Sequence, residues 1–285
     1  MLRPKTRVFV AGHAGMVGSA IVRVLSLRDD VEIVTADKLT LNLIDQEAVN
    51  NFFADKAIDV VFLAAARVGG IHANSSYPAA FLYENLMIQA NVIEASRIYG
   101  VERLLALGST CIYPRMAEQP VKETSLLAGR LEPTNEGYAV AKIAGLKLAE
   151  FYSRQYGCDF RAAMPTNLYG YGDNFSETAS HVIPALIRRF HEAKISGLDT
   201  VTIWGTGEPT REFLHVDDLA EVCVMLVDIP RSEYHAMTIE NGVSFVNIGS
   251  HTEITIAALA ELIRDVTGYQ GSIRFDHSKP DGTPR

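Results

Sequence analysis

Val8-Phe-Val-Ala-Gly-His-Ala-Gly-Met-Val-Gly18 joins a short apolar run to a loop that contains three glycines. In loops of this kind the glycines, here Gly12, Gly15 and Gly18, serve a tight turn, a close approach of the backbone to a pyrophosphate, and close packing of the next helix. The apolar helix that begins at Met16 directs its amino end at the negative charge of that pyrophosphate. The order strand, glycine loop, helix therefore predicts a dinucleotide-binding fold.

Short apolar runs alternate with longer amphipathic segments through the first half of the chain. We predict strands at 7–11, 31–36, 59–64, 103–107 and 159–164. The predicted helices are 16–28, 46–54, 80–99 and 138–156. This alternation is typical of a Rossmann-type doubly wound parallel sheet of the α/β class.

Pro165-Thr-Asn-Leu-Tyr-Gly-Tyr-Gly172 breaks the alternation and predicts the start of a smaller α/β lobe that binds substrate. Beyond it we expect a helix at 181–193, a strand at 201–204, a return to the first lobe through 212–227, and a last strand-helix-strand from 245 to 275. The predicted dinucleotide-binding domain is 1–166 with 211–240. The predicted substrate-binding lobe is 167–210 with 241–285.

Charge and cysteine usage exclude several classes of protein. A net charge of -8 and a pI near 5.5 provide no basic field for nucleic acid. Cys111, Cys158 and Cys223 form neither a CxxC metal pattern nor an even disulfide framework, which favours a reducing compartment, and we expect a cytoplasmic protein without metal. No apolar run reaches the ~18 residues of a membrane span.

Two opposite charges stand at the end of the second predicted strand, where a dinucleotide presents its adenosine ribose. Asp37 can accept hydrogen bonds from ribose hydroxyls and repel a 2′-phosphate, whereas Lys38 can pair with that phosphate. These residues alone leave NAD(H) and NADP(H) open. Both can also be solvated turn residues.

Tyr138 and Lys142 are four residues apart, so on a helix they share a face. An ammonium group beside a phenol stabilises the phenolate and lowers the tyrosine pKa from its usual value of about 10, which makes Tyr138 a proton donor to a carbonyl. Ser109 follows a predicted strand and can hydrogen-bond the same carbonyl, although a capping or turn role stays open. Together the three residues predict a dinucleotide-dependent carbonyl reductase.

Cys111 is a potential acid/base group that a plain reductase does not need. If the strand before it persists, Cys111 and Ser109 point the same way, toward the substrate. His181 opens an apolar helix, and its spacing alone favours a capping or surface role over a catalytic one. A base and an acid beside a ketone would exchange α-protons, because the carbonyl acidifies the neighbouring carbons. That chemistry is epimerisation.

These residues and the segments around them resemble the GDP-L-fucose synthase family of the extended short-chain dehydrogenases/reductases. The resemblance covers essentially every segment of the chain. The segments that carry it are GHAGMVGS (12–19), LAAARVGGI (63–71), GSTCIYP (108–114), LEPTNEGYAVAKIAG (131–145), MPTNLYG (164–170), SHVIPALIRRFH (180–191), REFLHVDD (211–218) and SKPDGTPR (278–285).

The resemblance implies an NADP(H)-dependent enzyme that epimerises GDP-4-keto-6-deoxy-D-mannose at C3 and C5 and reduces it at C4 to GDP-L-fucose. It implies that Cys111 is the base and His181 the acid, and that Ser109, Tyr138 and Lys142 perform the reduction. The expected cofactor-binding residues are Gly12, Gly15, Met16, Val17, Gly18, Asp37, Lys38, Tyr138, Lys142, Asn167 and His181. The expected substrate-binding residues are Ser109, Asn167, Arg189, Trp204 and Arg211, where guanidinium groups suit the diphosphate.

The chain departs from the family pattern at the cofactor. Ala14 stands where the family carries an arginine in the glycine loop, and Ala36 and Lys38 flank Asp37 where it carries arginines, so NAD(H) stays open. The sequence ends at Arg285, before a segment in which the family pattern continues, so we expect the carboxy end of the second lobe to be incomplete.

Family members often pair through two long helices, and we expect 80–99 and 138–156 to form a homodimer in this way. The alternatives in function are a related nucleotide-sugar 4-reductase or epimerase of the same fold, and a non-catalytic dinucleotide sensor. Cys111 and His181 argue against a simple 4-epimerase, and a complete triad argues against a sensor.

Overall fold

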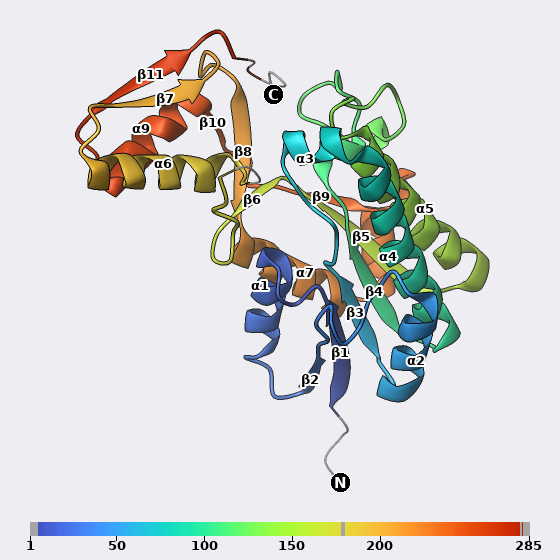
Figure 1. The fold of residues 1–285 in the computed structure, drawn as a ribbon. Coiled ribbons are helices and arrows are strands. Elements are labelled where there is room, and N and C mark those ends of the chain that lie inside the picture. Colours follow the sequence, from blue (N-terminus) through green and yellow to red (C-terminus); the bar gives the residue numbers. More distant parts are fainter. Residues whose placement is uncertain (1–4, 178–179, 280, 282–285) are drawn as a thin grey trace. The chain divides into compact units, whose positions relative to one another are not determined.

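The computed structural model describes residues 5–177, 180–279 and 281, which form two compact units (Figure 1). The first unit contains the described residues up to Thr166, together with Gly170–Gly172 and His215–Ile248. The second contains Asn167–Tyr169, Asp173–Leu214 and the described residues from Gly249 onward.

A six-stranded parallel sheet in the order β2-β1-β3-β4-β5-β9 forms the centre of the first unit. Its strands are β1 (Thr6–Ala11), β2 (Val31–Val34), β3 (Val60–Leu63), β4 (Arg103–Leu107), β5 (Asp159–Pro165) and β9 (Val246–Ile248). All four residues of β3 are buried, as expected for a strand covered on both faces. The predicted Rossmann-type doubly wound sheet is confirmed.

Helices cover both faces of this sheet (Figure 1). The helices of the first unit are α1 (Met16–Leu25), α2 (Gln46–Lys56), α3 (Ile71–Ser76), α4 (Pro78–Ile98), α5 (Glu136–Tyr156), α7 (Val216–Asp228) and α8 (Arg231–Met237). On one face α1 packs against α7, and on the other α4 packs against α2 and α5.

The α4–α5 contact fixes the helix that carries Tyr138 and Lys142. A Cβ atom on Gly145 of α5 would come within 2.1 Å of Gln89 Oε1 on α4, so the two helices approach closely. The Gln89 Nε2 atom donates to the carbonyl oxygen of Ala141 at 2.9 Å. A buried polar contact and a small residue therefore hold α5 in place.

The boundary that we predicted at 240/241 is wrong, because β9 belongs to the first unit. Its residues pair in parallel with β5, from Ala163 with Val246 to Pro165 with Ile248. The strand has only three residues, and the sequence shows no helix immediately before it, so its membership of the large sheet was not evident. The return from the second unit also falls at His215, not at residue 211.

A fully buried arginine ties the start of β5 to the end of α7. Arg161 donates to both carboxylate oxygens of Asp159, at 2.8 and 2.6 Å. Its remaining nitrogen donates to the carbonyl oxygens of Leu226 and Ile229, the latter at 2.9 Å. These carbonyls lie at the carboxyl end of a helix, where they lack intrahelical donors, so the guanidinium group completes the helix end.

The second unit contains two small sheets and two helices. The sheets have the strand orders β10-β8-β6 and β11-β7. The elements are β6 (Asn167–Tyr169), α6 (Val182–Ser196), β7 (Thr200–Trp204), β8 (Thr210–His215), β10 (Glu253–Thr255), α9 (Ile256–Thr267) and β11 (Ser272–Asp276). Of the segment 278–285, residues 280 and 282–285 lie outside the described residues. No helix in the described part of the chain is long and apolar enough to cross a membrane.

We expect Arg161→Met to lower the free energy of unfolding by about 3–5 kcal/mol, because it leaves a buried carboxylate and two carbonyls without their donor. Arg103→Met is the matched control, since Arg103 lies 3.8 Å from the same Asp159 carboxylate but is partly exposed. Its loss should cost at most about 1 kcal/mol. Urea unfolding followed by circular dichroism measures both. A loss of at most about 1 kcal/mol for Arg161→Met, as for the control, would show that Arg161 is dispensable.

Candidate active site

Two of the three loop glycines are required by the backbone of the first unit itself. Gly12 has φ +89, and a Cβ atom there would come within 2.7 Å of the Ala65 nitrogen. On Gly18 it would come within 2.1 Å of the Gly12 carbonyl oxygen. On Gly15 it would meet only the Gly12 oxygen, at 3.4 Å, which is nearly ordinary contact. The exposed Gly15 is therefore free of this structural requirement and can serve a ligand.

The amino end of α1 suits the pyrophosphate of a dinucleotide. Gly15 occupies the N-cap position in an extended conformation and provides no side-chain cap. The first amides of the helix, at Met16, Val17 and Gly18, therefore lack intrahelical acceptors and present the positive end of the helix dipole. Because a bare glycine precedes them, an anion can approach the backbone closely.

Asp37 closes a turn directly after β2, which ends at Val34 and not at residue 36 as predicted. Its Oδ1 atom accepts from the Leu39 and Thr40 amides, at 3.0 and 2.8 Å, and from the Thr40 hydroxyl at 2.8 Å. These hydrogen bonds, chiefly those from Thr40, hold the pKa of Asp37 below its usual value. An ionised carboxylate and the exposed Lys38 thus stand together at this end of the sheet.

Ser109 and Cys111 meet through a helical turn and not through a strand. The strand β4 ends at Leu107, and a 3₁₀ turn covers Thr110–Ile112, so the condition on which we expected both side chains to point the same way, a persisting strand, is not met. The Ser109 side chain nevertheless lies close enough to the Cys111 thiol to lower its pKa. Burial raises the pKa of Cys111, while Ser109 and the charge of Lys142 lower it.

Lys142 is buried, with 4% of its surface exposed, and its ammonium group donates to the Leu107 carbonyl oxygen at 2.8 Å. Burial lowers its pKa to about 8, against a smaller raising effect of Cys111. The Nζ atom lies 5.7 Å from the centroid of the Tyr138 ring. Ser109, Cys111, Tyr138 and Lys142 thus form one cluster at the carboxyl ends of the parallel strands, where open α/β sheets bind ligands.

The lowered tyrosine pKa that we expected is not observed. Burial raises the pKa of Tyr138, and the neighbouring Cys111 raises it further. The ammonium group of Lys142 lies over the aromatic ring and donates to the Leu107 carbonyl oxygen, so burial of the phenol decides the direction of the shift. In this structure Tyr138 stays protonated well above neutral pH.

The remaining predicted site residues lie in the second unit. His181 is exposed and occupies the N-cap of α6, and Arg189 is half-buried on the same helix. Asn167 on β6 is exposed and donates to the Glu212 carbonyl oxygen at 3.0 Å. Two further residues lie on strands. Trp204, on β7, is 57% exposed, and Arg211, on β8, is half-buried, so its pKa is lowered by burial.

Two features of the site were not predicted. In the first unit Arg67 lies over the Phe81 ring, 5.0 Å from its centroid, and the Phe81 ring packs edge-on against Tyr138. In the second unit Asp173 has a carboxylate oxygen, Oδ2, that is buried without a hydrogen-bond partner among the described residues. Burial raises its pKa, and the nearby His181 lowers it. Arg67 lies in the segment 63–71 that carries the family resemblance, whereas Asp173 lies in none of those segments.

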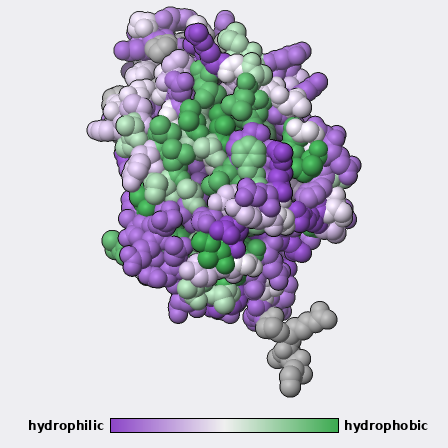
Figure 2. All heavy atoms as spheres, turned by 90° about the vertical axis from the view of Figure 1, so that its right-hand side faces the viewer, coloured by the Kyte–Doolittle hydropathy of each residue, from purple (hydrophilic) through white to green (hydrophobic). Residues whose placement is uncertain are grey.

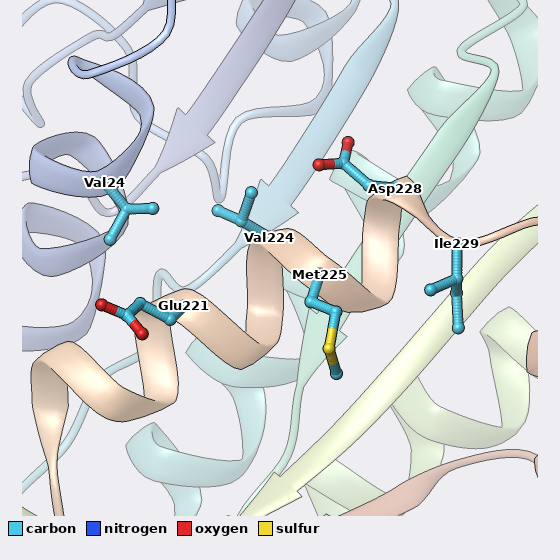
Figure 3. A pocket seen from close by; sticks show the side chains of 6 residues that line it. All are labelled: Val24, Glu221, Val224, Met225, Asp228 and Ile229. Carbon is cyan, nitrogen blue, oxygen red and sulfur yellow. The ribbon is translucent and has the colours of Figure 1, made fainter.

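A groove of about 470 Å³ lies between α1 and α7 in the first unit (Figure 3). The residues that line it are Val24, Glu221, Val224, Met225, Asp228 and Ile229. A neighbouring hollow shares Val224 and Asp228 and reaches Thr6, Val31 and Arg103, which lie at the amino ends of their strands. Because α/β sheets bind ligands at the opposite, carboxyl ends, we exclude this groove as the catalytic site.

The glycine turn before α1 and the cluster around Lys142 define a dinucleotide-dependent oxidoreductase. Comparison with known proteins agrees: the chain belongs to the NAD dependent epimerase/dehydratase family, whose model matches residues 8–242. It is 55% identical to GDP-L-fucose synthase of Escherichia coli K12 over 284 residues, 99% of this chain and 87% of that protein. It is 53% identical to GDP-L-fucose synthase 1 of Arabidopsis thaliana over 279 residues, 98% and 83% of the two chains.

Among solved structures, a GDP-D-glycero-L-gluco-heptose synthase from Campylobacter jejuni, determined in the presence of NADPH, is similar with a TM-score of 0.89. The two sequences are 34% identical, over 97% of this chain and 89% of that one. The predicted resemblance to GDP-L-fucose synthases is thereby confirmed at the level of sequence and fold.

The glycine loop allows its structural and ligand-binding roles to be separated. Gly18→Ala should destabilise the protein by about 1–3 kcal/mol, because its Cβ atom would overlap the Gly12 carbonyl. Gly15→Ala should leave stability within about 1 kcal/mol and weaken NADPH binding, because a methyl group then stands where the pyrophosphate approaches. Urea unfolding and titration of NADPH fluorescence give the two readouts. Tight NADPH binding by Gly15→Ala would contradict this assignment.

Proposed function

We propose that this protein converts GDP-4-keto-6-deoxy-D-mannose to GDP-L-fucose by epimerisation at C3 and C5 and reduction at C4. The observation that carries the proposal is the placement of Cys111 within the Ser109–Tyr138–Lys142 cluster, in a chain similar to GDP-L-fucose synthases over nearly its whole length. A reductase alone requires no thiol there, so the related 4-reductases and the dinucleotide sensor are not favoured.

NADP(H) is the cofactor, and the glycine loop fits it. Gly12, Gly15 and the amides that open α1 would hold its pyrophosphate, and Lys38 would face the 2′-phosphate beside Asp37. The bound cofactor supplies a hydride to C4 of the sugar. Lys142 would hydrogen-bond the nicotinamide ribose, and we assign Asn167 and His181 to the cofactor contacts as well.

In the reduction Tyr138 donates a proton to the C4 oxygen, while Ser109 hydrogen-bonds the same oxygen. The raised pKa of Tyr138 keeps the phenol protonated, which is the form that a donor needs. The buried ammonium of Lys142 lies near the ring and would stabilise the phenolate that forms. Reprotonation of the Tyr138 phenolate then restores the neutral phenol with which the reaction began.

In the epimerisation Cys111 removes the proton from C3 and C5, and His181 delivers a proton to the opposite face. Burial makes the Cys111 thiolate a strong base, while Ser109 and the charge of Lys142 stabilise it. The nearby His181 lowers the pKa of Asp173, so this carboxyl group lies close to the proposed acid. Arg189, Trp204 and Arg211 would bind the GDP portion of the substrate.

Two variants separate the half-reactions. Cys111→Ser should slow incorporation of deuterium from D₂O into the substrate by about 10²–10⁴-fold, because the general base is lost. Tyr138→Phe should block NADPH oxidation, followed at 340 nm, while deuterium incorporation continues. NADPH binding by both variants is the control. Loss of both steps in Tyr138→Phe would show that one residue serves both reactions.

We further propose that the protein forms a homodimer through α4 and α5 and resides in the cytoplasm. Figure 2 shows a broad apolar area on the face that carries these helices. Its large exposed side chains include Tyr83 and Ile98 of α4 and Val140, Phe151 and Tyr156 of α5. Such an area on one face is typical of an interface. The location is supported by three free cysteines and would be tested by cell fractionation.

Phe151→Asp should convert the dimer to a monomer, because it replaces a large exposed apolar side chain of α5 with a charge. The control is Leu27→Asp, since Leu27 is 86% exposed just beyond α1. Size-exclusion chromatography with light scattering should give twice the chain mass of 31.2 kDa for the parent protein and the control. A monomeric parent protein would refute the proposed pairing.

A further inference from the structure

The strands β7 and β11 lie side by side in the second unit (Figure 1), and the residues at and beyond their ends include a tryptophan and a lysine in contact. The two strands pair in parallel, and Trp204 is the register partner of Asp276. Because both strands end at the same edge, the residues that follow them are neighbours. Lys279 lies three residues beyond the end of β11, and its Nζ atom is 5.4 Å from the centroid of the Trp204 ring.

Hydrogen bonds hold the segment that carries Lys279 against the end of β7. The amides of Gly205 and Lys279 donate to the Asp276 carbonyl oxygen, at 3.0 and 3.1 Å. The Asp281 carboxylate accepts from the Thr206 amide at 2.6 Å and from its hydroxyl at 3.0 Å. These bonds on both sides of Lys279 restrict its backbone, so its contact with Trp204 is supported by the local fold.

The ammonium group of Lys279 is held by an aromatic face and not by a carboxylate. Within the described residues it makes no salt bridge, although Asp276 is near enough to feel its charge. The Asp276 Oδ1 atom accepts from the amide and hydroxyl of Ser278, and Asp281 is bound to Thr206. The indole face places the ammonium group, yet leaves it available to an anion.

We propose that Lys279 is a further substrate-binding residue that contacts the diphosphate of the nucleotide sugar, with Trp204 positioning its ammonium group. The inference rests on the proposed function, which assigns Trp204 to the GDP portion of the substrate. An ammonium group is a strongly hydrated point charge with three donors, suited to the several oxygens of a diphosphate. The exposed indole offers an adjacent surface for the rest of the nucleotide.

The sequence supplies its own probe, because Trp204 is the only tryptophan in the chain. Its fluorescence, excited at a wavelength selective for tryptophan, therefore reports on this pair alone, and we would titrate the full chain with GDP and separately with guanosine. Lys279→Met should weaken GDP binding by about tenfold, which corresponds to ~1.4 kcal/mol. It should leave guanosine binding unchanged, because guanosine carries no diphosphate. Lys279→Arg should retain most of the GDP affinity.

Arg274→Met is the matched control, since Arg274 is an exposed cation on β11 that also influences Asp276. It should bind GDP as the parent protein does. Equal GDP affinities for Lys279→Met and the parent protein, with turnover intact, would overturn the inference and leave the proposed function standing. Absence of any GDP binding by the parent protein, together with no turnover of the GDP-sugar, would overturn both.

Discussion

The hydrogen bond from the buried ammonium of Lys142 to the Leu107 carbonyl joins α5 to the end of β4. A buried cation is costly unless it is hydrogen-bonded, so the helix cannot shift along the sheet without leaving this charge unpaired. The same bond sets the separation of Lys142 from Tyr138 on the helix and from the Ser109–Cys111 turn after the strand. The chemistry of the first unit therefore depends on one contact between a helix and a strand end.

The first unit could be predicted from its sequence because its signals are local. A strand, a glycine loop and a helix follow one another between residues 6 and 25, and each has its own pattern. The apolar run at Val60–Leu63 and the helix at Glu136–Tyr156 are likewise readable from their periodicity. The end of α5 is also marked in the sequence, since Gly157 takes the left-handed conformation that ends this helix.

Long-range contacts account for what the sequence did not reveal. The three residues of β9 join the large sheet only through their pairing with β5, about 80 residues earlier in the chain. The direction of the Tyr138 pKa shift depends on burial, which spacing along a helix does not report. The expectation for Ser109 and Cys111 depended on a continuing strand, whereas the chain leaves the sheet after Leu107 and forms a 3₁₀ turn. The raised pKa of Asp173 likewise depends on burial, and its neighbour His181 lies eight residues further along the chain.

The membership of β9 in the large sheet also constrains biosynthesis. The chain passes from one unit to the other at 166/167, 169/170, 172/173, 214/215 and 248/249. During translation the sheet of the first unit therefore lacks its outer strand until Ile248 has left the ribosome, long after β5 has emerged. Until then the edge of β5 is an unpaired parallel strand, which is a surface prone to aberrant association. No single cut of the chain isolates the first unit, because the unit consists of three stretches that are separated by parts of the second.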